Sequence, residues 1–130
     1  MGDLDFKEKG VVLAGETFTM RNVETMRLQR RLNARFNGIL FGSASIIDDK
    51  GNFICLPGKE DLYLDTVESI VKMLCEGLQL PPEKAENVID MASDEEISEA
   101  FNAALELWFP LLLKKWEEVI KKTALQMPEE

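Results

Sequence analysis

From residue 61 onward, apolar residues recur at intervals of three and four, a spacing that places them on one face of a helix. Residues 62–79 are therefore predicted to form an amphipathic helix, with an apolar face made by Leu64, Val67, Val71, Leu74 and Leu78. Pro81 and Pro82 stop this helix and open a short one over residues 83–91, because proline suits only the first turn of a helix. This pattern constrains the second half of the chain to a helical structure.

A capping box marks the start of the next helix. Ser93 and Glu96 stand three residues apart in front of an apolar run, so that each side chain can bond the backbone N–H of the other. The predicted helix has an apolar face made by Ile97, Phe101, Ala104, Leu105, Trp108 and Leu112. Pro110 ends or kinks this helix, because its ring removes a hydrogen bond and restricts Phe109. Residues 111–125 are predicted to continue as a last helix.

The first 38 residues combine strand and helix signals. Two β-prone runs between residues 11 and 21 flank Ala14-Gly15-Glu16, which predicts a β-hairpin. Asn22 is predicted to be the N-cap of a helix that ends at Asn37-Gly38. The apolar stripe of this helix consists of Leu28, Leu32 and Phe36.

Residues 39–56 allow two interpretations. Apolar runs at 39–47 and 53–56 around a polar turn predict a second hairpin, whereas the small residues from Gly42 to Ser45 also suit a helix packed closely against a neighbour. In either case we expect an α+β fold, predominantly helical, with one or two small β-hairpins in the N-terminal half. Residues 1–130 are predicted to form a single domain, with a hairpin-containing part over about 1–57 and a helical part over about 61–125.

The composition argues against most enzyme classes. The chain has no histidine and only two cysteines, Cys55 and Cys75, which removes the usual general base and the common zinc sites. We therefore expect that the protein is not an enzyme and that it has no catalytic residue, bound metal or cofactor. A net charge of −9 disfavours nucleic acid as a partner. The lack of a signal peptide or a long apolar run predicts a cytoplasmic protein with reduced cysteines and no membrane contact.

Charge is divided sharply along the chain. All five arginines lie between residues 21 and 35, whereas residues 83–106 hold eight acids and one base. The spacing of Arg27, Arg31 and Arg35, with Arg30 beside them, predicts a basic helix face, and Glu95, Glu96 and Glu99 are predicted to form an acidic one. The two faces could join copies of the chain into a homo-oligomer. The alternative is that the arginines pair with acids of their own chain.

Seven consecutive apolar residues occupy positions 107–113, more than one face of a helix can bury. Either the chain covers this segment on all sides, or some of its side chains form an exposed patch that binds a partner. The residues predicted to bind a partner are Trp108, Phe109, Leu112 and Trp116.

The order of these elements resembles a family. The hairpin at 11–20, the helix after it, and above all the stretch 80–105 (LPPEKAENVIDMASDEEISEAFNAAL) are similar to tail assembly chaperones of long-tailed, non-contractile (lambda-like) bacteriophages. The resemblance implies a non-enzymatic protein that coats the tape measure protein, keeps it soluble and helps to recruit tail tube protein. Many members also exist in a longer form made by ribosomal frameshifting. A second hypothesis, independent of the resemblance, is an acidic inhibitory or regulatory protein that imitates nucleic acid and blocks a basic site.

Overall fold

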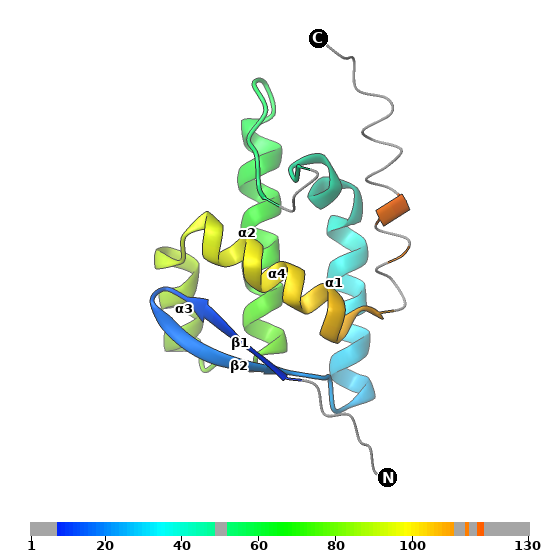
Figure 1. Cartoon of the computed structure of the whole chain (residues 1–130), viewed down its shortest axis with the longest axis vertical. Coiled ribbons are helices and arrows are strands. Elements are labelled where there is room, and N and C mark those ends of the chain that lie inside the picture. Colours follow the sequence, from blue (N-terminus) through cyan, green and yellow to red (C-terminus); the bar gives the residue numbers. More distant parts are fainter. Residues whose placement is uncertain (1–7, 49–51, 111–113, 115–116, 119–130) are drawn as a thin grey trace.

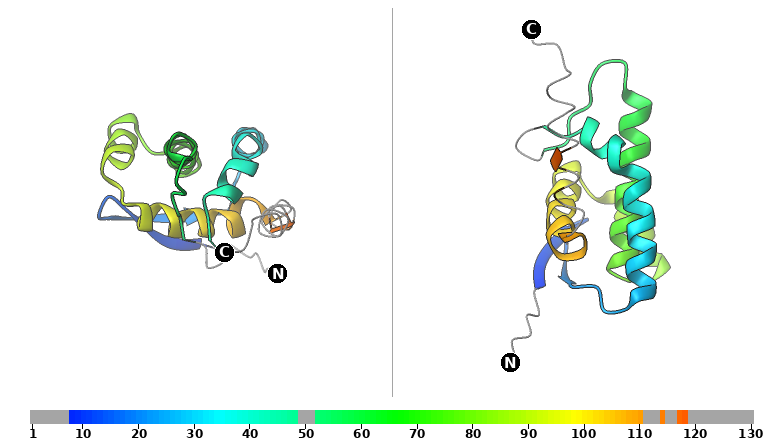
Figure 2. Two further views of the ribbon diagram at one scale, coloured as in Figure 1. Left: turned by 90° about the horizontal axis from the view of Figure 1, so that it is seen from above. Right: turned by 90° about the vertical axis from the view of Figure 1, so that its right-hand side faces the viewer.

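The computed structural model describes residues 8–48, 52–110, 114 and 117–118. In this part the elements are β1 (Glu8–Leu13), β2 (Glu16–Arg21), α1 (Met26–Ser45), α2 (Glu60–Gly77), α3 (Pro82–Met91) and α4 (Asp94–Trp108). They form two layers: α1, α2 and α3 lie side by side, and the β1–β2 hairpin and α4 cross one face of these three helices (Figures 1 and 2). The predicted α+β fold, mostly helical with a hairpin in the N-terminal half, is confirmed.

The predicted first hairpin is present. β1 and β2 pair antiparallel, with Leu13 opposite Glu16 across the two-residue turn Ala14-Gly15. Both turn residues have a positive φ, 55° for Ala14 and 78° for Gly15, the conformation that fits a tight turn to the twist of the strands. Alternate residues of the strands face inward, and the buried ones are Val11, Leu13 and Met20.

Helix α1 begins later and ends later than predicted. Its N-cap is Thr25 and not Asn22, because the Thr25 hydroxyl is the group that accepts from the backbone N–H of Leu28, at 3.2 Å. The helix also runs through Gly38 instead of stopping there. Further along, Gly42 lies so close to α2 that a Cβ at this position would come within 2.8 Å of Thr66 Oγ1. Close packing of α1 on α2 thus overrides the weak helix propensity of its glycines.

The second hairpin is reduced to a single bridge. Residues 39–45 belong to α1, so the alternative of a helix packed closely against a neighbour is confirmed for them. Only an isolated antiparallel bridge joins Ile47 to Phe53, and the backbone N–H of Ile54 donates to the carbonyl of Ile46 at 2.7 Å. The strand prediction is therefore wrong for residues 39–45, because they continue α1 and pack against α2, whereas Ile47 lies beyond the helix and forms the bridge.

The helical half agrees with the predictions as far as Trp108, whereas most of the last helix predicted over 111–125 lies outside the described residues. α2 and α3 lie within two residues of the predicted ranges, with Pro82 at the start of α3. The capping box is present: Ser93 Oγ accepts from Glu96 N at 3.1 Å, and Glu96 Oε1 accepts from Ser93 N at 2.9 Å. α4 ends at Trp108, two residues before Pro110. Local capping and proline signals therefore set these boundaries correctly.

α4 is central to the apolar core. It packs against β1 and β2 as well as α2, so that little of its surface faces solvent. The ring of Phe36 from α1 stacks on Phe109 with centroids 4.7 Å apart and also approaches Phe101 at 6.3 Å. One cluster of buried side chains thereby joins the hairpin to all four helices of the described part.

Candidate interaction surfaces

The described residues contain no group of three or more Cys, Asp or Glu side chains arranged to hold a metal ion. In the same part of the chain, no helix has the length and apolar character needed to cross a membrane. Cys75 is buried, and burial raises the pKa of its thiol, whereas Cys55 is exposed.

Helix α1 carries the predicted basic face, but α2 neutralises part of it. Arg31 Nε lies 2.9 Å from Glu76 Oε2, and Arg35 Nε donates to the other oxygen of the same carboxylate. The Glu76 side chain is 18% exposed, while the two arginine side chains are 63% and 48% exposed. Exposed ion pairs stabilise a fold by only about 0–1 kcal/mol each. For Arg31 and Arg35 the structure thus favours the alternative interpretation, pairing within the chain.

Arg27 and Arg30 remain available at the start of α1. Both are exposed, and neither forms an ion pair with any residue in the described ranges. The first turn of α1 also contains no acidic residue that would offset the partial positive charge of a helix N-terminus. This end of α1, which we call the basic corner (Arg27, Arg30 and the first turn of α1), is a positive region in a protein of net charge −9.

Glu96, which was predicted to belong to the acidic face, forms hydrogen bonds within its own chain. Its carboxylate accepts from the backbone N–H groups of Ser93 at 2.9 Å, Ala14 at 2.9 Å and Gly15 at 3.2 Å. The hydrogen bond from Ser93, together with those from the hairpin turn, lowers the pKa of Glu96. Glu96 therefore fastens the β1–β2 turn to the start of α4. The capping box could have indicated a structural role, but nothing in the sequence pointed to the contact with the hairpin.

Glu95 and Glu99 remain available on the surface. Both are exposed and lie in the first two turns of α4, and neither forms an ion pair with a described residue. Lys84 of α3 does not neutralise them, because its ammonium pairs with Glu16 at 2.6 Å. We call this surface the acidic edge and define it by Glu83, Glu86, Asp90, Glu95 and Glu99. α3, which carries three residues of the acidic edge, and α1, which carries the basic corner, lie on opposite sides of α2 (Figure 2).

Trp108 and Phe109 are buried, which contradicts their predicted role as exposed partner-binding residues. Each is only 1% exposed. Trp108 Nε1 donates to the carbonyl of Arg21 at 2.9 Å, the indole lies against Gly77, and Gln29 Nε2 donates to the Trp108 carbonyl at 2.9 Å. Both side chains are covered because α4 lies between the other elements, as the alternative interpretation expected. Leu112 and Trp116 lie outside the described residues.

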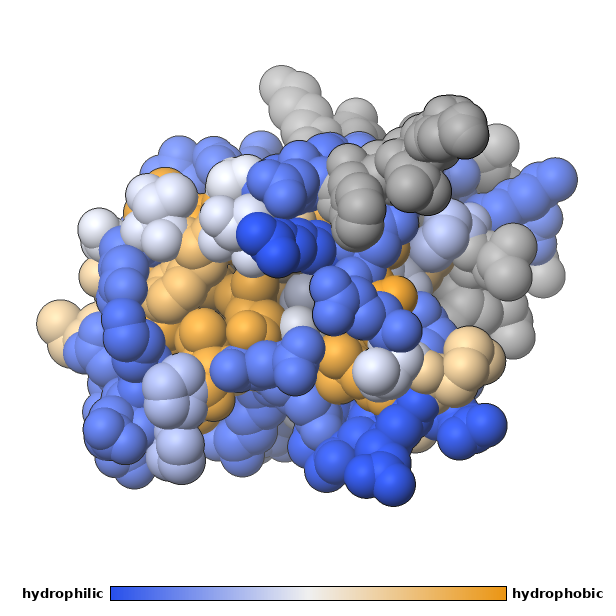
Figure 3. All heavy atoms as spheres, turned by 90° about the horizontal axis from the view of Figure 1, so that it is seen from below, coloured by the Kyte–Doolittle hydropathy of each residue, from blue (hydrophilic) through white to orange (hydrophobic). Residues whose placement is uncertain are grey.

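A hollow that sequence reasoning missed lies at the lower end of the molecule. It has a volume of about 370 Å³ and is lined by Thr19, Arg21, Asn22, Val23, Glu24, Leu28, Gly77, Leu78 and Gln79. The exposed surface of this lining is mainly polar, and Figure 3, which views this end of the molecule, shows apolar residues among hydrophilic ones. The lining comes from β2, the link into α1, and the end of α2. No sequence signal could have identified the hollow, because these segments are far apart in the chain.

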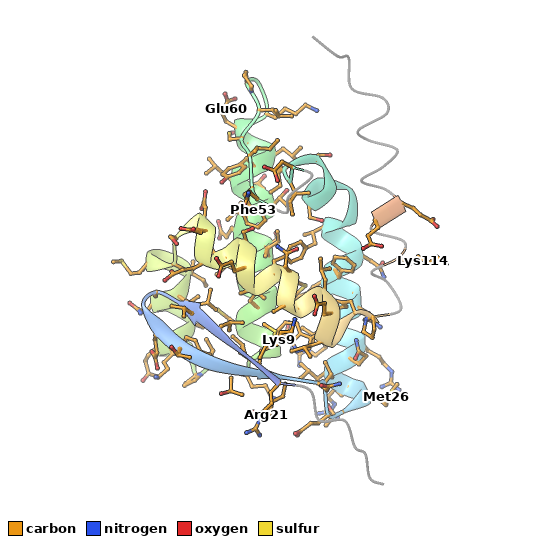
Figure 4. The ribbon with its side chains drawn as sticks, viewed as in Figure 1. Lys9, Arg21, Met26, Phe53, Glu60 and Lys114 are labelled. Atoms are coloured by element: carbon orange, nitrogen blue, oxygen red, sulfur yellow. The ribbon has the colours of Figure 1, made fainter. Side chains whose placement is uncertain are left out.

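Five large apolar side chains are exposed in the described part, and the three most exposed of them lie on different helices. Met26 opens α1 and is 68% exposed, Leu64 lies on α2 and is 63% exposed, and Met91 ends α3 and is 67% exposed. Figure 4 labels Met26 at the lower end of α1. Isolated apolar residues are common on protein surfaces and are not a binding site by themselves. Whether any of these side chains belongs to a protein interface depends on the charged residues around it.

No known protein family, no curated protein and no solved structure matches this chain. The resemblance to tail assembly chaperones therefore remains a prediction, and the surfaces described above are the basis for a functional proposal.

Proposed function

We propose that this chain is a non-enzymatic assembly protein that associates head to tail with copies of itself in the cytoplasm, and that its specific role is that of a phage tail assembly chaperone. The proposal rests on one observation: exposed basic and acidic side chains that have no ion-pair partner among the described residues lie in separate parts of the molecule. The basic corner and the acidic edge lie on opposite sides of the helical layer, and neither is neutralised by described residues of the same chain.

Two complementary faces on opposite sides of one molecule favour a heterologous contact. They cannot meet within one molecule, but the basic corner of one copy can meet the acidic edge of the next. Such a contact uses a different face on each partner, so repetition gives a ring or a filament. Both faces are exposed to solvent, and the attraction between them should therefore weaken as salt shortens the Debye length, from about 10 Å at 0.1 M to about 3 Å at 1 M.

A row of copies would suit the role implied by the resemblance. The tape measure protein is long and helical, and a repeating chaperone could cover it along its length and later give way to tail tube protein. Because Trp108 and Phe109 are buried, we do not include them among the residues that contact the tape measure protein. Exposed apolar side chains such as Leu64 are the available contacts for an amphipathic helix. Co-expression tests this role, since the chain should increase the soluble fraction of a tape measure protein, and no increase would contradict it.

Charge reversal tests self-association more directly. We expect Arg27→Glu with Arg30→Glu to lose the oligomer, and Glu95→Lys with Glu99→Lys to lose it as well. An equimolar mixture of the two double variants should associate again, because the unchanged acidic edge of the first variant can meet the unchanged basic corner of the second. Variants that oligomerise like the parent chain, or a mixture that stays monomeric, would argue against the proposal.

An acidic mimic of nucleic acid is a second candidate function. The acidic edge favours it, because five carboxylates on neighbouring helices are exposed there. A mimic would bind a basic nucleic-acid enzyme one to one, and added DNA would displace it. A parent chain that stays monomeric but binds such an enzyme in competition with DNA would support this candidate over the assembly protein.

A further inference from the structure

Strand β2 has one edge that no other strand of the described chain pairs with. We propose that this edge binds an extended, uncharged segment of a partner protein, which adds a third strand to the hairpin beside the hollow. The proposal does not depend on the charged faces and assigns a second interaction surface to the chain.

The register of the hairpin decides which backbone groups of β2 point outward. Leu13 and Glu16 flank the two-residue turn, and the pair in this position exchanges both of its hydrogen bonds. Along an antiparallel ladder, pairs that exchange hydrogen bonds alternate with pairs that do not. Thr17, Thr19 and Arg21 therefore direct their backbone N–H and C=O groups away from β1.

Most of this edge is open. β1 lies between β2 and α4 (Figure 1), and α4 packs mainly against β1. The outward carbonyl of Arg21 accepts from Trp108 Nε1, whereas the outward groups of Thr17 and Thr19 have no hydrogen-bond partner among the described residues. Both threonines are exposed. An unpaired strand edge presents donors and acceptors at the spacing of an extended peptide, which can bind there as an added strand.

The hollow lies along the same edge. The residues of β2 that line it are Thr19 and Arg21, whose backbone groups point outward. The exposed lining is mainly polar, and its charges are balanced, because Arg21 pairs with Glu8 at 3.3 Å and Glu24 is acidic. A peptide backbone is polar and carries no net charge, so it suits this lining better than an apolar or a charged group does.

Two side-chain amides add hydrogen-bonding groups beside the edge. Asn22 directly follows β2, and Gln79 lies shortly beyond the end of α2. Both are exposed, line the hollow and have no hydrogen-bond partner among the described residues. An amide can donate and accept, as a peptide backbone requires. Gln79 also has a φ of 55°, a conformation that favours glycine, and such strain is found preferentially at functional sites.

The pairing also defines the side chains of the partner segment. Its side chains would alternate between the outer face, beside Thr17 and Thr19, and the inner face, beside the half-buried Phe18. We therefore expect β-branched and aromatic residues and no proline at the positions that bond to β2.

Random dodecapeptides displayed on phage and selected against the full chain test the proposal. Selection in about 0.5 M salt weakens contacts with the charged faces, whereas hydrogen bonds between backbones persist. The enriched peptides are synthesised with a fluorescent label, and their affinity is measured by anisotropy. We expect Thr19→Pro to weaken binding at least about tenfold, because it removes an outward donor and places a ring against the incoming strand. Thr19→Val keeps the donor and should bind like the parent chain.

Two further measurements do not depend on the folding of Thr19→Pro. Gln79→Gly should bind the peptides about fivefold more weakly, because one amide is lost, although its urea midpoint should rise, because glycine tolerates the positive φ. In the parent chain, hydrogen exchange at the Thr17 and Thr19 amides should slow when a peptide binds.

The proposal is overturned if no peptide is enriched, if folded Thr19→Pro binds the enriched peptides like Thr19→Val, or if the Thr17 and Thr19 amides exchange at the same rate with and without peptide. A parent chain that dimerises in the same salt and protects these amides by itself also overturns it, because a second copy then covers the edge. None of these results bears on the salt-sensitive head-to-tail contact of the proposed function.

Discussion

Replacing Gly77 with alanine tests the buried position of Trp108, on which the packing of α4 depends. A Cβ built at Gly77 would lie 2.3, 2.5 and 2.7 Å from three atoms of the Trp108 ring. The indole cannot move away freely, because it is 1% exposed and its Nε1 donates to the Arg21 carbonyl at 2.9 Å. The substitution must therefore displace the indole or separate the end of α2 from α4.

The loss follows from three contributions. Overpacking a filled core site costs about 1–3 kcal/mol, and weakening the hydrogen bond to Arg21 costs about 1 kcal/mol more. The better helix propensity of alanine offsets at most about 1 kcal/mol. We expect Gly77→Ala to reduce the free energy of unfolding by about 2 kcal/mol.

Urea unfolding followed by circular dichroism measures this change, as a lower midpoint with an unchanged slope. Gly38→Ala is the matched control, because a Cβ at Gly38 meets nothing within 4 Å. It should stabilise the fold by about 0.5–1 kcal/mol. If Gly77→Ala were as harmless as Gly38→Ala, Trp108 would not lie against Gly77 and the described packing of α4 would be wrong.

Two pH-dependent predictions follow from the hydrogen bonds that join the layers. The folded pKa of Glu96 lies below its ordinary value of about 4.3, so its ionised form stabilises the fold above that pH, and this stabilisation is lost as the pH falls through the lowered pKa. Glu96→Gln should therefore reduce stability at about pH 7 and do so less and less below about pH 4, and a pH-independent loss in urea unfolding would contradict this role. Burial and the hydrogen bond to Asp94 raise the pKa of Tyr63, the only tyrosine of the chain. Its phenolate absorbance should appear well above pH 10 in the folded protein and near pH 10 in urea, whereas coincident titrations would show that Tyr63 is not held by Asp94.

Local chemistry made the helical half predictable. The Ser93–Glu96 box and Pro82 act on their own backbone, so their consequences can be read from a few neighbouring residues. The tight Ala14-Gly15 turn is a local signal of the same kind. The end of α1 could not be predicted from local residues, because Gly38 ends a helix only when packing against another element does not compensate for its weak helix propensity. Packing of α1 against α2, which lies further along the sequence, determined where α1 ends.

The candidate site was predictable only in outline. The sequence showed where basic and acidic residues cluster. It did not show that Glu76 would form ion pairs with Arg31 and Arg35, or that Glu96 would accept hydrogen bonds from the hairpin turn. Burial of Trp108 depended on its contacts with Arg21, Gln29 and Gly77, which come from three other elements and which no spacing within one helix reveals. The hollow beneath β2 arises from three segments that meet only in the folded chain.

Light scattering coupled to size exclusion tests the central claim most directly, with the parent chain at several concentrations in low and high salt. Association of the basic corner with the acidic edge predicts a mass that rises with concentration at low salt and returns to the 14.7 kDa monomer at high salt. A monomer under every condition would contradict the claim that these faces join copies of the chain.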